Sequence, residues 1–171
     1  GFLKGFNSPG VYLMDAGSLR QVRTPNNLSL LSGGVPPTSV SDYVLSHFAN
    51  GPTTGSFVTD GSTNYLMADG QKHVIDSTAK ANWRLGTPDT LNSATLARFG
   101  TGAPVNNKLQ ASGAYFYVLG GVAYGTVDRN IAEMWGVSDA PNLSTTLIKE
   151  YLGGSMMTRI VKSTIPGDSR L

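Results

Sequence analysis

The sequence predicts an α+β fold made of three ββαα repeats, each a short β-meander followed by two helices. Two separate blocks of apolar residues recur at shared intervals of 51 to 53 residues, which indicates a repeat architecture. The recurring positions are Tyr12, Tyr65 and Tyr117; Val22, Ile75 and Val127; Leu30, Trp83 and Trp135; Val40, Leu91 and Leu143; Leu45, Leu96 and Ile148; and Phe48, Phe99 and Tyr151.

The predicted organisation is a single repeat domain over residues 1–171. Its repeats span residues 1–51, 52–105 and 106–154, and residues 155–171 form a closing strand and tail. One copy alone cannot bury both its hairpin face and its helix stripe, so the copies must pack on one another. We expect a closed pseudo-threefold arrangement, in which a terminal strand at residues 157–161 pairs with the first repeat and hides an open edge.

The first block of each repeat is predicted to be a β-hairpin. In the second copy, residues 64–67 and 71–75 flank a turn that contains Asp69-Gly70, and Asp-Gly between apolar runs favours a type I′ turn. Ala16-Gly17 and Gly120-Gly121 take the same place in the other copies. A short strand precedes each hairpin, at residues 2–4, 56–58 and 108–110.

The second block is predicted to be two short helices. Thr24-Pro25 combines an N-cap hydroxyl with a proline at the first helical position, and Asp76 and Asp128 occupy the matching places. The second helix follows Ser41, Asn92 or Ser144 as N-cap, with apolar residues immediately before and four after the cap that form a hydrophobic staple. We expect this helix to end at the glycine that closes each copy: Gly51, Gly102 and Gly154.

Composition narrows the classes of function. The formal charge of +2 is too small to indicate a nucleic-acid partner or an anionic membrane surface, and 14% charged residues suit a weakly charged extracellular surface. No cysteine is present, so disulfides and thiolate metal sites are excluded, which favours a bacterial source. No apolar run approaches the roughly 20 residues of a membrane span, so we expect no membrane insertion. The chain begins at Gly1 without a leader, which indicates a processed chain or an excised piece.

Catalytic, metal and cofactor motifs are missing from the sequence. It contains no G-x-S-x-G elbow, Walker loop, dinucleotide fingerprint or H-E-x-x-H zinc motif. Its carboxylates have local explanations as turn or cap residues, and no facing pair for glycoside hydrolysis is evident. We therefore expect no enzyme activity, no catalytic residue, no metal and no cofactor.

The candidate binding residues are polar or aromatic side chains on the hairpins, together with two tryptophans. The set is Arg20, Lys72, His73, Tyr124, Trp83 and Trp135. Trp83 and Trp135 could stack on a sugar ring, but recurrence at one position is also typical of a core residue. By the repeat interval His73 matches Gly125, whereas Tyr124 and Tyr115 have no counterpart and are better candidates for exposed contacts.

The hairpin of the second copy resembles a known repeat. Residues 64–75, Asn-Tyr-Leu-Met-Ala-Asp-Gly-Gln-Lys-His-Val-Ile, are similar to the Y-L-V-x-x-G-x-K-x-x-I segments of about 50 residues that are appended to secreted cell-wall hydrolases and surface proteins of actinobacteria. Trp83 to Gly86, then residues 91–99 and Thr101-Gly102, follow the order of that pattern. Leu19 and Tyr124 replace the basic residue Lys72 in the other copies. The resemblance implies a non-catalytic accessory module that keeps its host at the cell envelope.

These observations favour a carbohydrate- or cell-wall-binding accessory module of a secreted bacterial protein, with polysaccharide or peptidoglycan as partner. Other domains of a larger host protein are further candidate partners, and the expected location is secreted or at the cell surface. The alternative is a protein-interaction or spacer module of a surface or phage structural protein. An exposed apolar patch would favour that alternative over glycan binding. A small glycoside hydrolase is the third hypothesis and would need a buried carboxylate pair.

Overall fold

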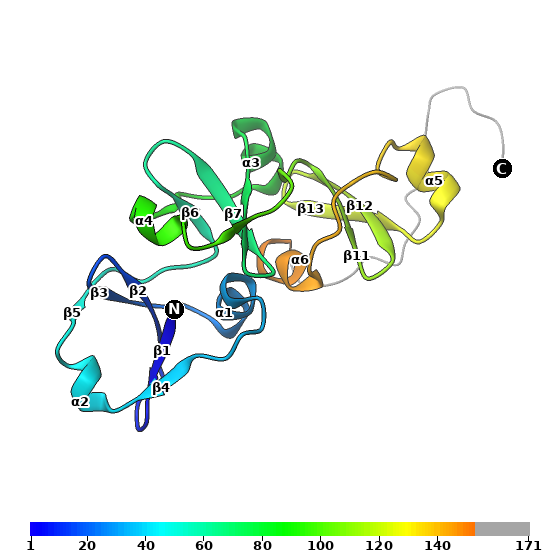
Figure 1. Cartoon of the computed structure of the whole chain (residues 1–171). Helices are drawn as coiled ribbons and strands as arrows, with labels where there is room; N and C mark the ends of the chain where they lie inside the picture. The colour runs from blue at the N-terminus through cyan, green and yellow to red at the C-terminus, as the bar shows by residue number, and fades with distance from the viewer. Residues whose placement is uncertain (153–171) are drawn as a thin grey trace.

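The computed structural model describes residues 1–152, and within them the chain is mostly β. This part of the chain forms three separate sheets, of five, five and three strands, with six short helices. Figure 1 shows the sheets as an open row, with the second between the first and the third. The prediction of three ββαα repeats in a closed pseudo-threefold array is therefore wrong. The expected strand at residues 157–161 and the expected helix stop at Gly154 lie outside the described residues.

Unit one is the first sheet with its two helices. Its elements are β1 (Phe2–Gly5), β2 (Val11–Asp15), β3 (Ser18–Gln21), α1 (Pro25–Ser32), β4 (Thr38–Val40), α2 (Asp42–Leu45) and β5 (Ala49–Asn50). The strands β1, β2 and β3 form an antiparallel meander. The sheet is completed by β4 parallel to β1 and by β5 parallel to β3.

Unit two repeats this order of elements. It contains β6 (Phe57–Thr59), β7 (Asn64–Ala68), β8 (Gln71–Val74), α3 (Ser77–Trp83), β9 (Asp89–Thr90), α4 (Ser93–Leu96) and β10 (Gly100–Thr101). Unit three has the meander and two helices: β11 (Lys108–Ala111), β12 (Ala114–Leu119), β13 (Val122–Thr126), α5 (Arg129–Met134) and α6 (Thr145–Tyr151). A single parallel bridge between Gln110 and Asn142 stands where β9 would be.

The fold prediction failed because the chain around each second helix is extended. The helices α2 and α4 have only four residues, and the segments on either side of them pair with the edges of their own sheet. Gly51 and Gly102 do not end a helix. Each instead follows a strand and donates its backbone N–H to a carbonyl of the neighbouring strand, Leu19 or Lys72. Pairing by these short strands covers sheet edges that the prediction had assigned to a terminal strand.

Turn and cap signals were confirmed. All three predicted turn pairs have positive φ at both residues, as a type I′ turn requires: 47° and 86° at Ala16-Gly17, 52° and 73° at Asp69-Gly70, and 61° and 78° at Gly120-Gly121. The side chain of every predicted N-cap residue accepts a hydrogen bond from the first turn of its helix. These residues are Thr24, Ser41, Asp76, Asn92, Asp128 and Ser144.

The repeat interval misassigns the third hairpin by one residue. Counted from the turn, the counterpart of Tyr12 and Tyr65 is Phe116, because these three residues occupy the same step of the hairpin ladder. A shift of one residue moves a side chain to the opposite face of a strand. Tyr117 therefore corresponds to Leu13 and Leu66, and Tyr124 corresponds to Arg20 and His73. In the first helices, the seventh residue after the N-cap is Leu31, Trp83 or Trp135, so Leu31 replaces Leu30 as the counterpart of the tryptophans.

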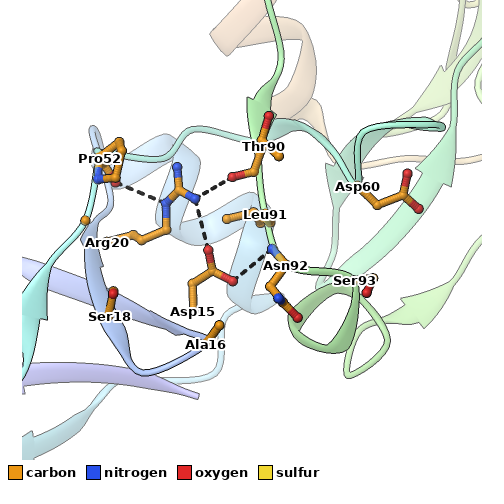
Figure 2. Close-up of a pocket in the computed structure, with 11 residues that line it drawn as sticks. Asp15, Ala16, Ser18, Arg20, Pro52, Asp60, Thr90, Leu91, Asn92 and Ser93 are labelled. Carbon is orange, nitrogen blue, oxygen red and sulfur yellow. Dashed lines mark hydrogen bonds and ion pairs between the residues drawn. The ribbon is translucent and has the colours of Figure 1, made fainter.

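The junction between units one and two combines an apolar cluster with a buried ion pair. Leu13, Val22 and Leu31 of unit one are buried together with Val58, Met67, Leu91 and Leu96 of unit two. Arg20 pairs with Asp15 at 2.9 Å, and its guanidinium also donates to the carbonyl of Thr90 in unit two (Figure 2). The second carboxylate oxygen of Asp15 accepts from the backbone N–H of Asn92 at 3.0 Å.

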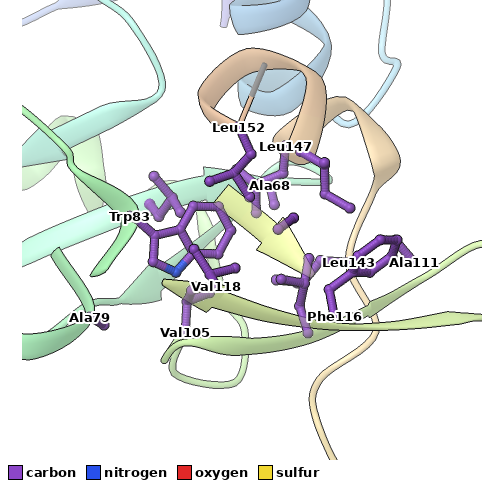
Figure 3. Close-up of a cluster of buried hydrophobic side chains, with 14 of the residues drawn as sticks. Ala68, Ala79, Trp83, Val105, Ala111, Phe116, Val118, Leu143, Leu147 and Leu152 are labelled. Atoms are coloured by element: carbon purple, nitrogen blue, oxygen red, sulfur yellow. The ribbon is translucent and has the colours of Figure 1, made fainter. Parts of the chain in front are cut away.

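The junction between units two and three is the larger apolar cluster (Figure 3). Leu66, Ala68 and Trp83 of unit two are buried in it with Leu143, Leu147 and Ile148 from the second-helix segment of unit three. The indole N–H of Trp83 donates to the carbonyl of Asn106 at 2.8 Å.

The helix α6 also reaches α1 of unit one, beside which it lies in Figure 1. Asn27 of α1 donates to Glu150 at 2.6 Å, and the hydroxyls of Ser56 and Tyr151 are 2.7 Å apart. Burial raises the pKa of Tyr151 to about 12, against the opposing effect of its hydrogen bond to Ser56. The phenol of Tyr151 is therefore neutral at physiological pH. Through these contacts of α6, all three units touch one another.

Trp83 and Trp135 occupy equivalent positions, so substituting each one measures how much a following unit contributes to the free energy of unfolding. We expect Trp83→Ala to lower the free energy of unfolding by about 3–5 kcal/mol, because it leaves a large cavity in a closed core. We expect Trp135→Ala to cost less than half as much, because its ring is partly exposed. Urea denaturation followed by circular dichroism gives both values. Equal losses would show that the two positions are equally packed.

The ion pair between Asp15 and Arg20 makes the first junction sensitive to acid. Burial acts to raise the pKa of Asp15, but the Thr95 hydroxyl, the hydrogen bonds from Arg20 and Asn92 and the charge of Arg20 together outweigh it, so the pKa lies below its usual 3.8. The ionised form is thus favoured by folding, and its contribution is lost as pH falls through the lowered pKa. We expect Asp15→Asn to cost about 3–5 kcal/mol at neutral pH.

The deficit of Asp15→Asn relative to the wild type should shrink as pH falls below about 5, because the stability that the ionised Asp15 adds is lost as pH falls through its lowered pKa. Chemical denaturation at a series of pH values measures this difference. Asp139→Asn, which removes an exposed carboxylate, is the matched control and should follow the wild type. A deficit that stays constant down to pH 2 would contradict the role assigned to the Asp15 charge.

Candidate interaction site

The cleft beside the Asp15–Arg20 pair contains the first of the predicted site residues (Figure 2). This cleft has a volume of about 540 Å³. Residues that line it include Asp15, Ser18, Arg20, Asp60, Asn92 and Ser93. The Arg20 side chain is buried, and its Nε donates to the carbonyl of Pro52 at 3.1 Å in addition to the bonds across the junction. Its hydrogen bonds hold the two units and the segment after β5 together.

Asp60 faces the same cleft and is held by its own turn. Backbone N–H groups of Thr63 and Ser62 and the hydroxyl of Ser62 donate to its carboxylate, which lowers the pKa to about 2. A carboxylate with this pKa is ionised at neutral pH and has no proton to give as a general acid. Asp60 is therefore not a general acid in this cleft.

Lys72 caps the helix α4 of its own unit. Its Nζ donates to the carbonyls of Leu96 at 3.0 Å and Phe99 at 3.2 Å. A cation at the carboxyl end of a helix satisfies free carbonyls and interacts favourably with the helix dipole. These two hydrogen bonds explain why a lysine stands at position 72, and no bound ligand is needed to explain it.

His73 is buried at the hairpin position that Arg20 occupies in unit one. Its Nδ1 lies 2.7 Å from the carbonyl of Ala103, just as Arg20 Nε binds the carbonyl of Pro52. Gly102 lies directly over the imidazole ring, and a Cβ there would be 2.1 Å from His73 Cε1. Both residues fasten the segment that leaves the unit, and the imidazole faces the protein interior.

Trp83 is 1% exposed and lies inside the cluster between units two and three (Figure 3). Neither face of its ring is open to a sugar, so the packing alternative describes this residue. Of the six predicted residues, Arg20, Lys72, His73 and Trp83 all have internal partners. They come from two different units and do not form one site.

Tyr124 and Trp135 are the two predicted residues that the structure brings together. With Tyr117 and Leu119 they line an open apolar groove of about 350 Å³ on unit three. Tyr117 pairs with Tyr124 and Leu119 pairs with Val122 across the hairpin, so these four side chains share one face of the sheet. We name the surface made by Tyr117, Leu119, Val122, Tyr124 and Trp135 the Trp135 face.

The opposite face of the same sheet is fully covered, which identifies the Trp135 face as the one left open. Phe116 and Val118 point into the large cluster, whereas Leu119 is 52% exposed. Two more exposed apolar residues, Val127 and Met134, lie on the chain between β13 and the end of α5. A cluster of exposed apolar residues of this kind is typical of an interaction site.

Sequence reasoning missed Tyr117, Leu119 and Val122. The repeat interval matched Tyr117 with Tyr12 and Tyr65, whereas the hairpin register matches it with Leu13 and Leu66. The available signal was the strand at residues 114–119, Ala-Tyr-Phe-Tyr-Val-Leu, which is apolar on both faces. A strand in an antiparallel sheet usually has one polar face toward solvent. A strand that is apolar on both faces therefore needs other residues to cover both of them.

The described residues include no group of three or more histidine, cysteine, aspartate or glutamate side chains that could hold a metal ion. Within residues 1–152 the longest helix, α1, has eight residues, and no helix has the length and apolar character to cross a membrane.

No protein-family model matches the chain, and no curated protein sequence matches it. Among solved structures, the chain is similar to a chain of the periplasmic assembly from the ESX-5 inner membrane complex and to one of the EccB3 dimer from the ESX-3 core complex. Both alignments have 11% identity and a TM-score of 0.28 and cover 96% of this chain. The chain spans 61% and 64% of the length of these two. At this TM-score neither likeness supports a conclusion about fold or function.

Proposed function

We propose that the protein is a protein-interaction module and that the Trp135 face is its binding surface. The observation that carries this proposal is the open apolar groove lined by Tyr117, Leu119, Tyr124 and Trp135. Tryptophan and tyrosine, which provide three of the four lining residues, are enriched among the residues that contribute most binding energy in protein interfaces.

The composition of the groove favours a protein partner over a sugar. Its four lining residues offer only two phenol hydroxyls and one indole N–H as polar groups. A sugar carries a hydroxyl on most ring carbons, and each one that is buried without a partner costs free energy. The polar hairpin residues that could have met those hydroxyls, Arg20, Lys72 and His73, are engaged within the protein.

The accessory role in a secreted or surface protein, the actinobacterial type of repeat and the lack of enzyme activity stay predictions from sequence. Carbohydrate or cell-wall binding is the competing function, and the polar cleft beside Arg20 offers polar groups for it. The cleft lies between units one and two and the Trp135 face lies on unit three, so substitutions can separate the two functions.

Leu119→Asp tests the proposal, because it places a charge at the centre of the Trp135 face. We expect the immobilised wild-type chain to retain a defined protein from bacterial envelope extract, and Leu119→Asp to bind that protein at least tenfold more weakly, about 1.4 kcal/mol. Biolayer interferometry with the purified partner gives the dissociation constants. Val74→Asp is the matched control, since Val74 is an exposed apolar residue on unit two and its loss should leave binding unchanged.

The same variants are then tested on purified peptidoglycan and wall polysaccharide. Retention on a glycan that free sugar releases and that Leu119→Asp does not alter would reject the interaction module in favour of carbohydrate binding. Loss of that retention in Asn92→Ala, a residue that lines the polar cleft, would place the sugar there.

A further inference from the structure

The two internal junctions of this protein are built in the same way. At the first, the backbone N–H of Gly70 in the hairpin turn of unit two donates to the carbonyl of Leu30 in α1, at 3.0 Å. At the second, Gly121 in the turn of unit three donates to the carbonyl of Asn82 in α3, at 2.8 Å. Leu30 and Asn82 are both the sixth residue after the N-cap of their helix. Each unit thus places its turn against the first helix of the preceding unit.

The second helix segment of each unit also covers the hairpin face of the preceding unit. Leu91 and Leu96 of unit two are buried with Leu13 and Leu31 of unit one. At the next junction, the equivalent pair of unit three, Leu143 and Ile148, belongs to the cluster that holds the equivalent pair of unit two, Leu66 and Trp83.

Unit three has no following unit within the described residues, and its hairpin face is open for that reason. Tyr117, Leu119 and Tyr124 occupy the positions of Leu66, Ala68 and His73, which are all buried. Trp135 likewise occupies the position of the buried Trp83. The Trp135 face is therefore the uncovered half of a third junction of the same kind.

No unit precedes unit one among the described residues, and Val44 of its second helix is exposed in the complementary way. The third residue after the N-cap is buried in units two and three, where Thr95 is 1% and Leu147 is 0% exposed. In unit one this residue is Val44, which is 42% exposed. We name the surface around Val44 the α2 surface; its exposed residue is Val44, and the half-buried Val40 and the buried Leu45 are its neighbours in the same segment. Its side chains are apolar, like those of Leu143, Leu147 and Ile148 at the same three positions.

We propose that the Trp135 face of one molecule binds the α2 surface of a second copy, so that the chains associate head to tail. This inference rests on the proposed function and names its partner. The internal junctions supply the geometry, and α2 of unit one and the sheet of unit three lie at opposite ends of the row of sheets in Figure 1. Different surfaces of the two molecules meet in such a contact, so it can continue to a third copy and beyond, or close into a ring.

Two complementary variants test this arrangement. Val44→Asp blocks the α2 surface and keeps the Trp135 face, and Leu119→Asp does the reverse. In sedimentation velocity we expect the wild-type sedimentation coefficient to rise with concentration between about 1 and 200 µM, a range that detects micromolar association. Each variant alone should remain monomeric. Their equimolar mixture should form a dimer that does not grow further, since each of its chains then has one blocked end.

NMR locates the contact. When unlabelled Leu119→Asp is added to ¹⁵N-labelled Val44→Asp, amide shifts should change around residues 117–124 and 135 in unit three. Val74→Asp controls for a charge on an exposed valine and should associate like the wild type. Near-ultraviolet circular dichroism of each variant confirms folding. If a variant unfolds, Val44→Lys and Leu119→Lys serve as a second pair.

Three outcomes overturn the inference. A wild-type chain that is monomeric at every concentration has no head-to-tail contact. Self-association of a single variant, or a mixture that behaves like its separate components, indicates a symmetric or unrelated interface. If the wild type is monomeric but still captures a protein in a Leu119-dependent manner, the proposed interaction function holds and only the identity of the partner is wrong.

Discussion

Burial of the hairpin faces of units one and two by the unit that follows each is the constraint on which the rest of the structure depends. The sheets of units two and three have apolar side chains on both faces, and one face is covered by the second helix segment of the same unit. The other face needs residues from elsewhere in the chain, and at two junctions the next unit supplies them. None of the described helices exceeds eight residues, so neither helix propensity nor helix length could hold such a unit together alone.

One hairpin position has a different role in each of the three units. Three residues after the turn glycine stand Arg20, His73 and Tyr124. The first two bind the carbonyl that follows the closing glycine of their unit, and Arg20 also reaches Thr90 of the next unit. Tyr124 faces an open groove instead. Polarity at this position therefore follows from the local partner, and a charged or aromatic residue there does not by itself indicate a ligand.

Sequence reasoning succeeded where the signal is local and failed where it depends on distant pairing. The N-caps from Thr24 to Ser144 and the three turns were predicted because a single hydroxyl, carboxylate or glycine specifies the backbone nearby. The strands β5, β9 and β10 have two residues each and leave no alternating pattern to detect. The site was predicted only in part, because Tyr124 and Trp135 were selected but Tyr117 was not. The repeat interval placed Tyr117 one residue away from its true register. Trp83 is buried by residues of unit three, and the sequence of a single repeat does not show such a contact.

The close contact between Gly33 and the turn of unit two has a consequence for shape. A Cβ at Gly33 would lie 2.7 Å from the carbonyl oxygen of Asp69, so only glycine allows the end of α1 and the turn to approach this closely. A larger residue would have to rotate the second unit relative to the first. In an assembly that repeats one junction, each rotation adds to the one before it, as in the pitch of a screw. Curvature of the whole could thus change through residue 33 while both ends of every molecule remained chemically the same.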